Sequence, residues 1–294
     1  MAAPEPVLVP AHASASVADP VPDPDAELPA LHATSPLIEP PPRAPTRADP
    51  WVHRRAEPRP LALMWTGYLL LTTVACLGPI TSALFLTPDI YRPAASLLLA
   101  CSALGVALFW PMIRLSQQAP YGRATRAAFV DAVAIFFPLQ ATIWPQAMPA
   151  LSSWDVSITA AVAAVSTAWL ALTGGLLAIA LAHTASAERS GHPAPVRRAV
   201  WMSLFVALAF GAWLVGMASG TLGPAAPSQS GSTLALWSPA SAVFEITSDR
   251  SWLGRAAVVL PLHWRSALIV GIAAAITWTT AFLLEAIVFR RRPS

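Results

Sequence analysis

The sequence contains no lysine and no asparagine, and all 18 of its basic residues are arginine. Without lysine there is no phosphate-binding loop of the Gly-Lys-Ser/Thr type and no Schiff-base lysine. Without asparagine there is no acceptor for N-glycosylation. Two cysteines are too few for a disulfide-stapled secreted domain. Only 11% of the residues are charged, against roughly a quarter in an average soluble domain. These absences exclude an ordinary soluble enzyme, a coiled coil and a disulfide scaffold.

Hydrophobic residues, in contrast, make up 55% of the 294 residues, and the mean hydropathy is +0.57. Six apolar runs have about the 20-residue length that a helix needs to cross a bilayer; they cover residues 61–86, 94–113, 127–147, 156–182, 199–219 and 267–289. Inside a bilayer every backbone donor and acceptor must be paired locally, so runs of this length predict helices. The expected fold is an all-α integral membrane protein, with a six-helix transmembrane bundle over residues 61–294.

The first 60 residues have a different composition. They hold 15 of the 30 prolines, with acidic residues up to position 42 and five arginines between positions 43 and 60. Proline lacks a backbone donor and has a fixed φ, and the segment has too little apolar surface to offset the entropy of ordering. We therefore predict that residues 1–60 are a disordered, Pro/Ala-rich cytoplasmic tail. The segment is not a signal peptide, because no basic region followed by an apolar run opens it.

The arginines predict the orientation in the membrane. Fourteen of them lie in the tail, in the connections after the second and fourth helices, and after the last helix, whereas Arg92, Arg250, Arg255 and Arg265 fall on the other side. The positive-inside rule then predicts that both termini are cytoplasmic, in a protein of a bacterial inner membrane. The net charge of +3 is a consequence of this threading and does not indicate nucleic-acid binding. Interfacial tryptophans are expected on the inner side at Trp65, Trp110 and Trp201, and on the outer side at Trp144, Trp154 and Trp264.

The outer connection over residues 220–266 is long and is expected to contain short interfacial helices. Ser238 as N-cap and Pro239 at the first helical position predict a short helix over residues 240–247. The apolar stretch 252–262 is too short to span the membrane but suits an interfacial or re-entrant helix.

Three polar side chains within the predicted spans are candidates for a transport path: Asp131, Gln140 and Glu285. Each also has a structural interpretation, which we favour. Asp131 lies about one turn from the cytoplasmic end, within reach of water and of Arg123 or Arg126. Gln140 is deeper, where amides often form hydrogen bonds between helices. Glu285 precedes the Arg290–Arg292 cluster, with which it can pair at the interface.

Proline and glycine add two predictions about helix geometry. Pro138 lies near the bilayer centre and removes a backbone hydrogen bond, so it predicts a kink in the third helix. Small residues permit close approach of helices, and they include the pair Gly174-Gly175 and the Gly216-x-x-x-Gly220 spacing. Such spacing is typical of packing within a bundle and also occurs in helix dimers, so a homodimer is compatible with it.

The chain carries no arrangement typical of catalysis. Its six histidines do not pair at ligand spacing, and no Ser-His-Asp set, HExxH motif or dinucleotide fingerprint is present. Cys76 and Cys101 are expected at similar depth in adjacent helices, without further ligands for a metal. We therefore expect no enzyme activity, no metal site and no cofactor.

The last 80 or so residues resemble the permease subunits of ABC exporters of the second type. The resemblance rests on Trp237-Ser238-Pro239-Ala240, on the interfacial stretch up to Trp264, and on the final Phe289-Arg290-Arg291-Arg292. It implies a homodimer that acts with a separate ATPase subunit, since this chain has no nucleotide motif. Two features depart from the family: a Pro-rich tail replaces the short amphipathic connecting helix, and the cytoplasmic loop 114–126 is short for docking an ATPase. The alternative is a non-transporting membrane scaffold or assembly factor that uses the tail as a tether.

Overall fold

The computed structural model describes residues 58–82, 87–117, 123–189, 194–219, 234–249 and 257–290. The tail predicted over residues 1–60 therefore lies outside the described residues, except for its last three. The α-helices are α1 (Pro58–Leu77), α2 (Pro88–Leu104), α3 (Trp110–Ser116), α4 (Ala124–Ile143), α5 (Val156–Arg189), α6 (Ala194–Ala218), α7 (Pro239–Thr247) and α8 (Pro261–Arg290). A π-helical turn, η3 (Gly105–Phe109), joins α2 to α3, and short 3-10 turns form η2 (Gly78–Ser82), η4 (Trp144–Ala147) and η5 (Leu234–Trp237). Within the described ranges there is no β-strand.

In the part of the chain that the structure describes, six helical segments are long and apolar enough to cross a membrane, which confirms the predicted fold of an all-α integral membrane protein. They are Pro58–Ile80, Pro88–Ser116, Ala124–Ala147, Val156–Ser186, Pro195–Ala218 and Pro261–Ile287. The second span contains α2, η3 and α3 in one continuous helix.

The helix bounds in the structure differ from those of the predicted apolar runs, at N-terminal as well as C-terminal helix ends. The first α-helix stops at Leu77, before Gly78 and Pro79, because proline cannot continue the hydrogen-bond ladder. The second and last spans begin about six residues before their apolar runs, at Pro88 and Pro261. Proline suits the first turn of a helix, where its missing N–H has no partner to lose. The helix predicted over residues 252–262 is not formed at 257–260, which have no regular secondary structure before α8 begins at Pro261, and 252–256 lie outside the described residues.

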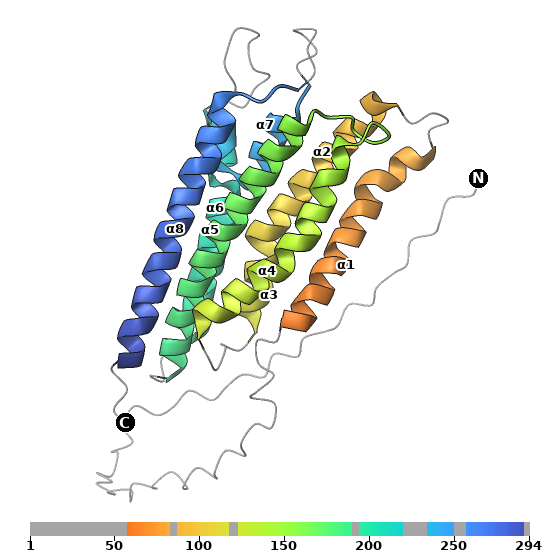
Figure 1. Ribbon diagram of the computed structural model, residues 1–294. Coiled ribbons are helices and arrows are strands. Elements are labelled where there is room, and N and C mark those ends of the chain that lie inside the picture. Colours follow the sequence, from red (N-terminus) through yellow and green to blue (C-terminus); the bar gives the residue numbers. More distant parts are fainter. Residues whose placement is uncertain are drawn as a thin grey trace, which may run out of the picture. The chain divides into compact units, whose positions relative to one another are not determined.

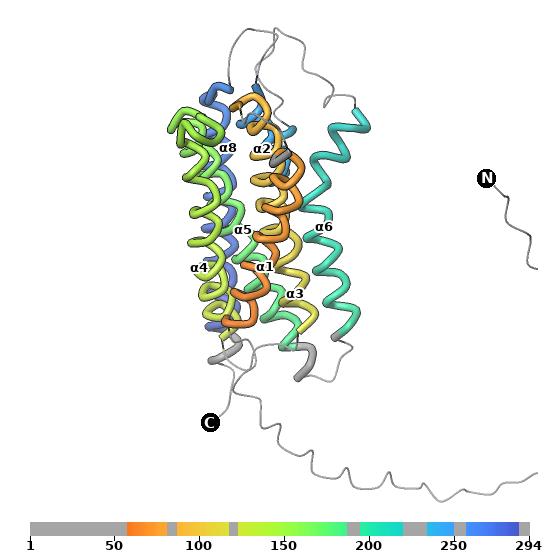
Figure 2. Tube along the Cα trace, turned by 90° about the vertical axis from the view of Figure 1, so that its right-hand side faces the viewer, coloured from red at the N-terminus to blue at the C-terminus, as the bar shows by residue number. Residues whose placement is uncertain are grey.

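The spans alternate in direction, so that α1, α4 and α6 begin at the end of the bundle where α3, α5 and α8 finish (Figure 1; Figure 2). Two spans occupy the centre. In the most apolar window of α5, 72% of the residues are buried, and in that of α2–α3, 61%, whereas the other four spans reach at most 28%. The remaining spans therefore form the rim, with their exposed apolar side chains directed to the lipid side.

Small residues bring α5 and α8 together. A Cβ built on Gly175 would lie 3.0 Å from the Thr277 Cβ and 3.1 Å from the backbone nitrogen of Trp278, and one on Gly174 would lie 3.0 Å from the Trp278 ring. The Trp278 indole N–H also donates to the carbonyl oxygen of Ala171 on α5 at 2.8 Å. A side chain at Gly175 would press against the backbone of α8 and one at Gly174 against the Trp278 ring, so glycine at both positions lets the two helices approach closely. Of the other predicted pair, Gly216 lies in α6, and Gly220 lies outside the described residues.

The short helix α7 lies near the end of the bundle where α1, α4 and α6 finish, here called the outer end (Figure 1). It begins where the Ser238-Pro239 pair predicts, with Ser238 in extended backbone at the N-cap. The Ser238 hydroxyl does not cap the helix, however, and donates instead to the Ala209 carbonyl of α6 at 2.6 Å. Val243 and Ile246 are fully buried, so α7 packs into the bundle, while Phe244 remains 42% exposed.

Candidate functional site

A π-helical turn in the second span sets the direction of the side chains that follow it. The Trp110 N–H bonds to the Gly105 carbonyl, five residues back, which adds one residue to the turn. One residue rotates the following helix by about 100°. Tyr68 of α1 lies against this turn, stacked on Phe109 at 4.7 Å and donating from its hydroxyl to the Cys101 carbonyl at 2.7 Å. A Cβ on Gly105 would lie 2.8 Å from the Tyr68 ring carbon Cζ. Glycine at position 105 therefore makes room for the tyrosine.

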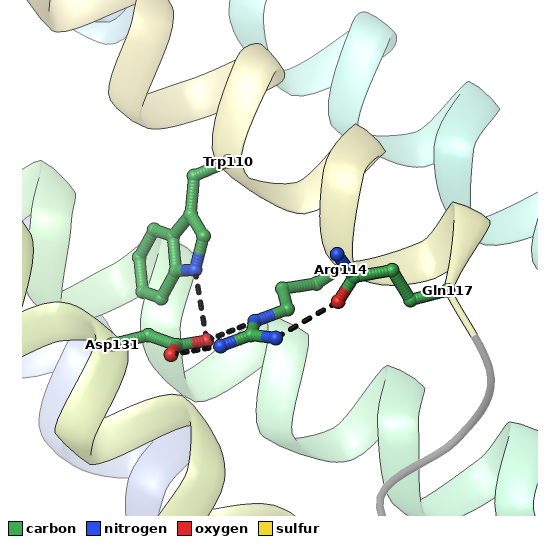
Figure 3. A network of polar contacts seen from close by, with 4 residues as sticks. All are labelled: Trp110, Arg114, Gln117 and Asp131. Carbon is green, nitrogen blue, oxygen red and sulfur yellow. Dashed lines mark hydrogen bonds and ion pairs between the residues drawn. The ribbon is translucent and has the colours of Figure 1, made fainter. Parts of the chain in front are cut away.

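Below this turn, a buried ion pair joins α3 to α4 (Figure 3). The Arg114 Nε donates to the Asp131 Oδ2 at 2.5 Å, and its Nη2 donates to Oδ1, so the contact is bidentate. The Trp110 indole N–H donates to the same Oδ2 at 3.4 Å, and the Arg114 Nη1 donates to the Gln117 Oε1 at 2.8 Å. Arg114 is 4% exposed and Asp131 is 1% exposed. Bidentate charge-assisted pairs of this kind are among the strongest polar contacts in proteins.

The partner of Asp131 is therefore Arg114, and not Arg123 or Arg126, the two arginines expected within its reach. Arg126 is five residues before Asp131 on the same helix, so the two side chains leave α4 in directions about 140° apart. Arg123 precedes the helix in extended backbone and is exposed. Arg114 comes from another span, 17 residues away in the sequence, and only the packing of that span against α4 brings it to the carboxylate.

Three of the six tryptophans expected at the membrane interfaces lie in the bundle interior. Trp65 and Trp110 are fully buried and Trp154 is 3% exposed, so these three side chains point into the bundle, while their depth near a membrane interface stays a prediction. Trp144 and Trp264 are 46% and 45% exposed, as an interfacial position requires. The Trp110 indole is drawn inward because it has a buried acceptor in Asp131, and its ring edge lies against Gly174 of α5, where a built Cβ would lie 3.2 Å from it. Residues 110 and 174 thus connect the ion pair to the α5–α8 contact.

The other two transport-path candidates have separate partners. The Gln140 Nε2 donates to the Thr167 Oγ1 of α5 at 3.0 Å, and its Oε1 accepts from the Trp144 indole at 3.0 Å. Glu285 of α8 accepts a hydrogen bond from the Thr125 hydroxyl of α4. Thr125 and Gln140 lie six and nine residues from Asp131, or about 9 Å and about 14 Å along the helix axis in opposite directions. Asp131, Gln140 and the Thr125 partner of Glu285 are therefore at three different levels of α4, and the three candidates do not form one site.

Several polar atoms in the interior have no hydrogen-bond partner. Among them are the indole nitrogens of Trp65, Trp154 and Trp169 and the hydroxyl of Thr173, all in side chains at most 3% exposed. Trp169 and Thr173 are four residues apart on α5 and so lie on one face of it. The helices α4 and α5 are antiparallel, and the Gln140–Thr167 bond shows which residues lie at the same level. Counted from this bond, Trp169 and Thr173 lie one to two turns nearer than Asp131 to the end of the bundle where α4 finishes. Sequence reasoning missed this face, because tryptophan and threonine in an apolar run are indistinguishable from ordinary packing residues.

No group of three or more His, Cys, Asp or Glu side chains among the described residues could hold a metal ion. Cys76 and Cys101 are free thiols of α1 and α2. Pro138 lies inside α4, which continues through it to Ile143, and its carbonyl accepts the Thr142 hydroxyl at 2.9 Å. The kink expected at Pro138 stays a prediction. What the site offers chemically is a neutralised charge pair toward the end of the bundle where α4 begins, with unpaired donors of α5 nearer the end where α4 finishes.

No family model, no curated protein and no solved structure matches this chain.

Proposed function

We propose that this chain is a permease-like transport subunit of a bacterial inner membrane and that it acts with a separate ATPase. The observation that carries the proposal is the set of buried polar atoms without partners on the interior side of α5. A buried donor without an acceptor costs free energy in a static bundle. The same donors are useful where water or a polar solute passes between helices, because they meet its acceptor atoms.

The Arg114–Asp131 pair supports the same function from the inner side. Charges within a membrane protein face the bundle interior and often mark transport routes. Here the pair joins α3 to α4 (Figure 3), and we infer that it lies between the unpartnered donors and the ends of these helices that the arginines assign to the cytoplasm. In this proposal the pair is the inner closure of the path, and its opening separates α3 from α4.

The proposed location follows from the distribution of arginines over the bundle. Among the described residues the six candidate spans alternate in direction, so the first residue of α1 and the last residues of α8 lie at the same end of the bundle (Figure 1). That side carries Arg59, Arg123, Arg126, Arg197 and Arg198, whereas the opposite ends of the spans carry Arg92 and Arg265. The positive-inside rule assigns the arginine-rich side to the cytoplasm. A reporter fused to the C-terminus tests this: a fluorescent protein that folds only in the cytoplasm should be bright, and alkaline phosphatase should be inactive.

The ATPase is tested by purifying the tagged full chain from native membranes in a mild detergent. We expect an ATPase in fixed proportion to the chain and vanadate-sensitive ATP hydrolysis by the complex. In this complex Thr173→Val should lower hydrolysis without lowering stability, because the change removes a hydroxyl that has no partner and keeps the side-chain shape. Thr167→Val is the matched control, since its hydroxyl accepts from Gln140. Absence of an ATPase, or hydrolysis unaffected by Thr173→Val, would contradict the proposal.

A second candidate function, a non-transporting scaffold or assembly factor, is favoured by the short cytoplasmic connections. Between α3 and α4 the chain has seven residues, 117–123, and between α5 and α6 it has four, 190–193. A cytoplasmic partner would then bind mainly through the terminal segments. Deleting residues 2–50 should abolish recruitment of that partner and leave membrane insertion intact. A transport complex that assembles normally with the truncated chain would exclude the tether.

A further inference from the structure

The segment Leu234–Asp249, here called the outer plug, fills the outer part of the bundle without crossing it. It consists of η5, Ser238, α7 and two residues after the helix. Its buried side chains are small or β-branched: Ala235, Ala242, Val243, Ile246 and Thr247, together with Leu236 and Pro239. The plug packs against α2 and α5, the two spans that occupy the centre of the bundle. Non-spanning backbone at this depth is tolerated only where protein or a water-filled cavity surrounds it.

The contacts that hold the plug at its inner side are single hydrogen bonds. The Ser238 hydroxyl donates to the Ala209 carbonyl of α6 at 2.6 Å, and the Ser266 hydroxyl of α8 donates to the Leu236 carbonyl at 3.3 Å. Both acceptors are backbone carbonyls. No charged side chain takes part in these two hydrogen bonds, so breaking them leaves no unpaired charge in the interior.

The outer end of the plug is held by an ion pair. The Arg92 Nη1 of α2 lies 3.3 Å from the Asp249 Oδ2, and the Arg92 Nε donates to the Ser152 carbonyl in the α4–α5 connection at 2.9 Å. The other carboxylate oxygen of Asp249 accepts the Ala257 N–H at 3.0 Å. The pair thus ties together three outer segments of the chain. Arg92 is 18% exposed and Asp249 is 33% exposed, so solvent reaches both charges.

We propose that the outer plug is the outer gate of the transport path and that the Arg92–Asp249 ion pair is the latch that keeps it closed. The proposal rests on the proposed transport function. The path between the two closures contains the unpartnered donors of α5, with the Arg114–Asp131 pair at its inner end and the plug at its outer end. Both closures are formed in this structure, so it represents the occluded state. Rupture of the latch releases Asp249 from Arg92, while its bond to the Ala257 N–H remains, and lets α7 move away from α2 and α5.

The gate is tested by the accessibility of Val243, which is fully buried in the plug. Val243→Cys is made in the full chain with Cys76→Ala and Cys101→Ala, and a membrane-impermeant maleimide is added from outside. Opening the latch by Asp249→Asn should speed labelling about two- to fivefold, the change that an exposed ion pair commonly supports. The charge exchange Arg92→Asp with Asp249→Arg should return labelling to the parent rate. Leu177→Cys, fully buried towards the inner side, is the control and should stay unlabelled in all backgrounds.

The outcomes separate the gate from the transport function. If Asp249→Asn leaves the labelling rate of Val243→Cys unchanged, the plug is a fixed part of the fold and the gate is wrong. If Leu177→Cys is labelled as well, the faster labelling comes from loss of the fold and not from a gate. A chain with Arg92→Cys and Asp249→Cys, bridged by a short bifunctional thiol reagent, should show slower ATP hydrolysis in the complex. Labelling that responds to the latch in a chain without any ATPase partner would support the gate and refute the proposed function.

Discussion

Removing either charge of the Arg114–Asp131 pair should destabilise the bundle far more than removing both. Asp131 is 1% exposed and accepts both hydrogen bonds of a bidentate contact, so neutralising it leaves a guanidinium without a counter-charge at a site 4% exposed. Removal of one partner of a buried pair costs about 3–5 kcal/mol, against a total stability of roughly 5–15 kcal/mol. Asp131→Asn should therefore cost a large part of the stability.

The reverse variant should cost less. In Arg114→Met the remaining carboxyl can be neutralised by taking up a proton, an escape that the guanidinium lacks. In the double variant, Arg114→Met with Asp131→Leu, no charge is buried, and such replacements are often neutral or stabilising. The Trp110 indole then loses its acceptor, at a cost of about 1–3 kcal/mol. The expected order of stability is double variant, then Arg114→Met, then Asp131→Asn.

The assay is reversible unfolding of the purified chain in mixed micelles, with increasing sodium dodecyl sulfate and helicity as the readout. Glu285→Gln is the matched control, because Glu285 is a carboxylate of the same membrane domain that is only partly buried and is bonded to a neutral hydroxyl of Thr125. Its replacement should cost about 1 kcal/mol. If Asp131→Asn costs no more than Glu285→Gln, or if the double variant is as unstable as the sum of the two single variants, the reasoning from burial is refuted.

Two further predictions use the same assay. Gly175→Ala should destabilise the protein by about 1–3 kcal/mol, because the new Cβ meets the backbone of α8. In the control Gly271→Ala the new Cβ would meet nothing within 4 Å, and the stability should stay within about 1 kcal/mol of the parent. Equal effects would mean that α5 and α8 are not in close contact. Gln140→Leu and Thr167→Val should each lower the free energy of unfolding by about 0.6–2 kcal/mol. The double variant should lose no more than the larger single effect, because both changes remove the same hydrogen bond. Additive losses would show that the two side chains do not interact.

The sequence predicts correctly those features that depend on neighbouring residues. The six spans follow from the length of apolar runs, and the start of α7 follows from the pair Ser238-Pro239. The predicted ends were less accurate, because Pro88 and Pro261 start helices outside their apolar runs. The close contact at Gly174 and Gly175 could also be anticipated, since small residues in a membrane helix indicate close approach whatever their partner is.

The partners of the polar side chains could not be predicted in this way. Asp131 was identified as a candidate, but its partner Arg114 is on another span, and the π-turn at Gly105 rotates that span into place. The Ser238 hydroxyl illustrates the same limit: its position is that of a helix cap, yet its nearest acceptor belongs to α6. Which acceptor a side chain finds depends on how each helix is rotated about its axis, and this rotation is set by the packing of all its neighbours.

The scarcity of charge and the six long apolar runs by themselves determined that this is an integral membrane protein, and the arginines predict on which side its ends lie. Both are properties of a segment and its solvent, because a bilayer sorts residues by hydropathy and charge along one axis. Only the tertiary structure decided that Arg114 neutralises Asp131, that Trp65 and Trp110 are interior residues, and that α7 enters the bundle between α2 and α5. The bilayer fixes the depth of a residue, but contacts around the bundle axis arise from side-chain packing, which joins residues that are far apart in the sequence.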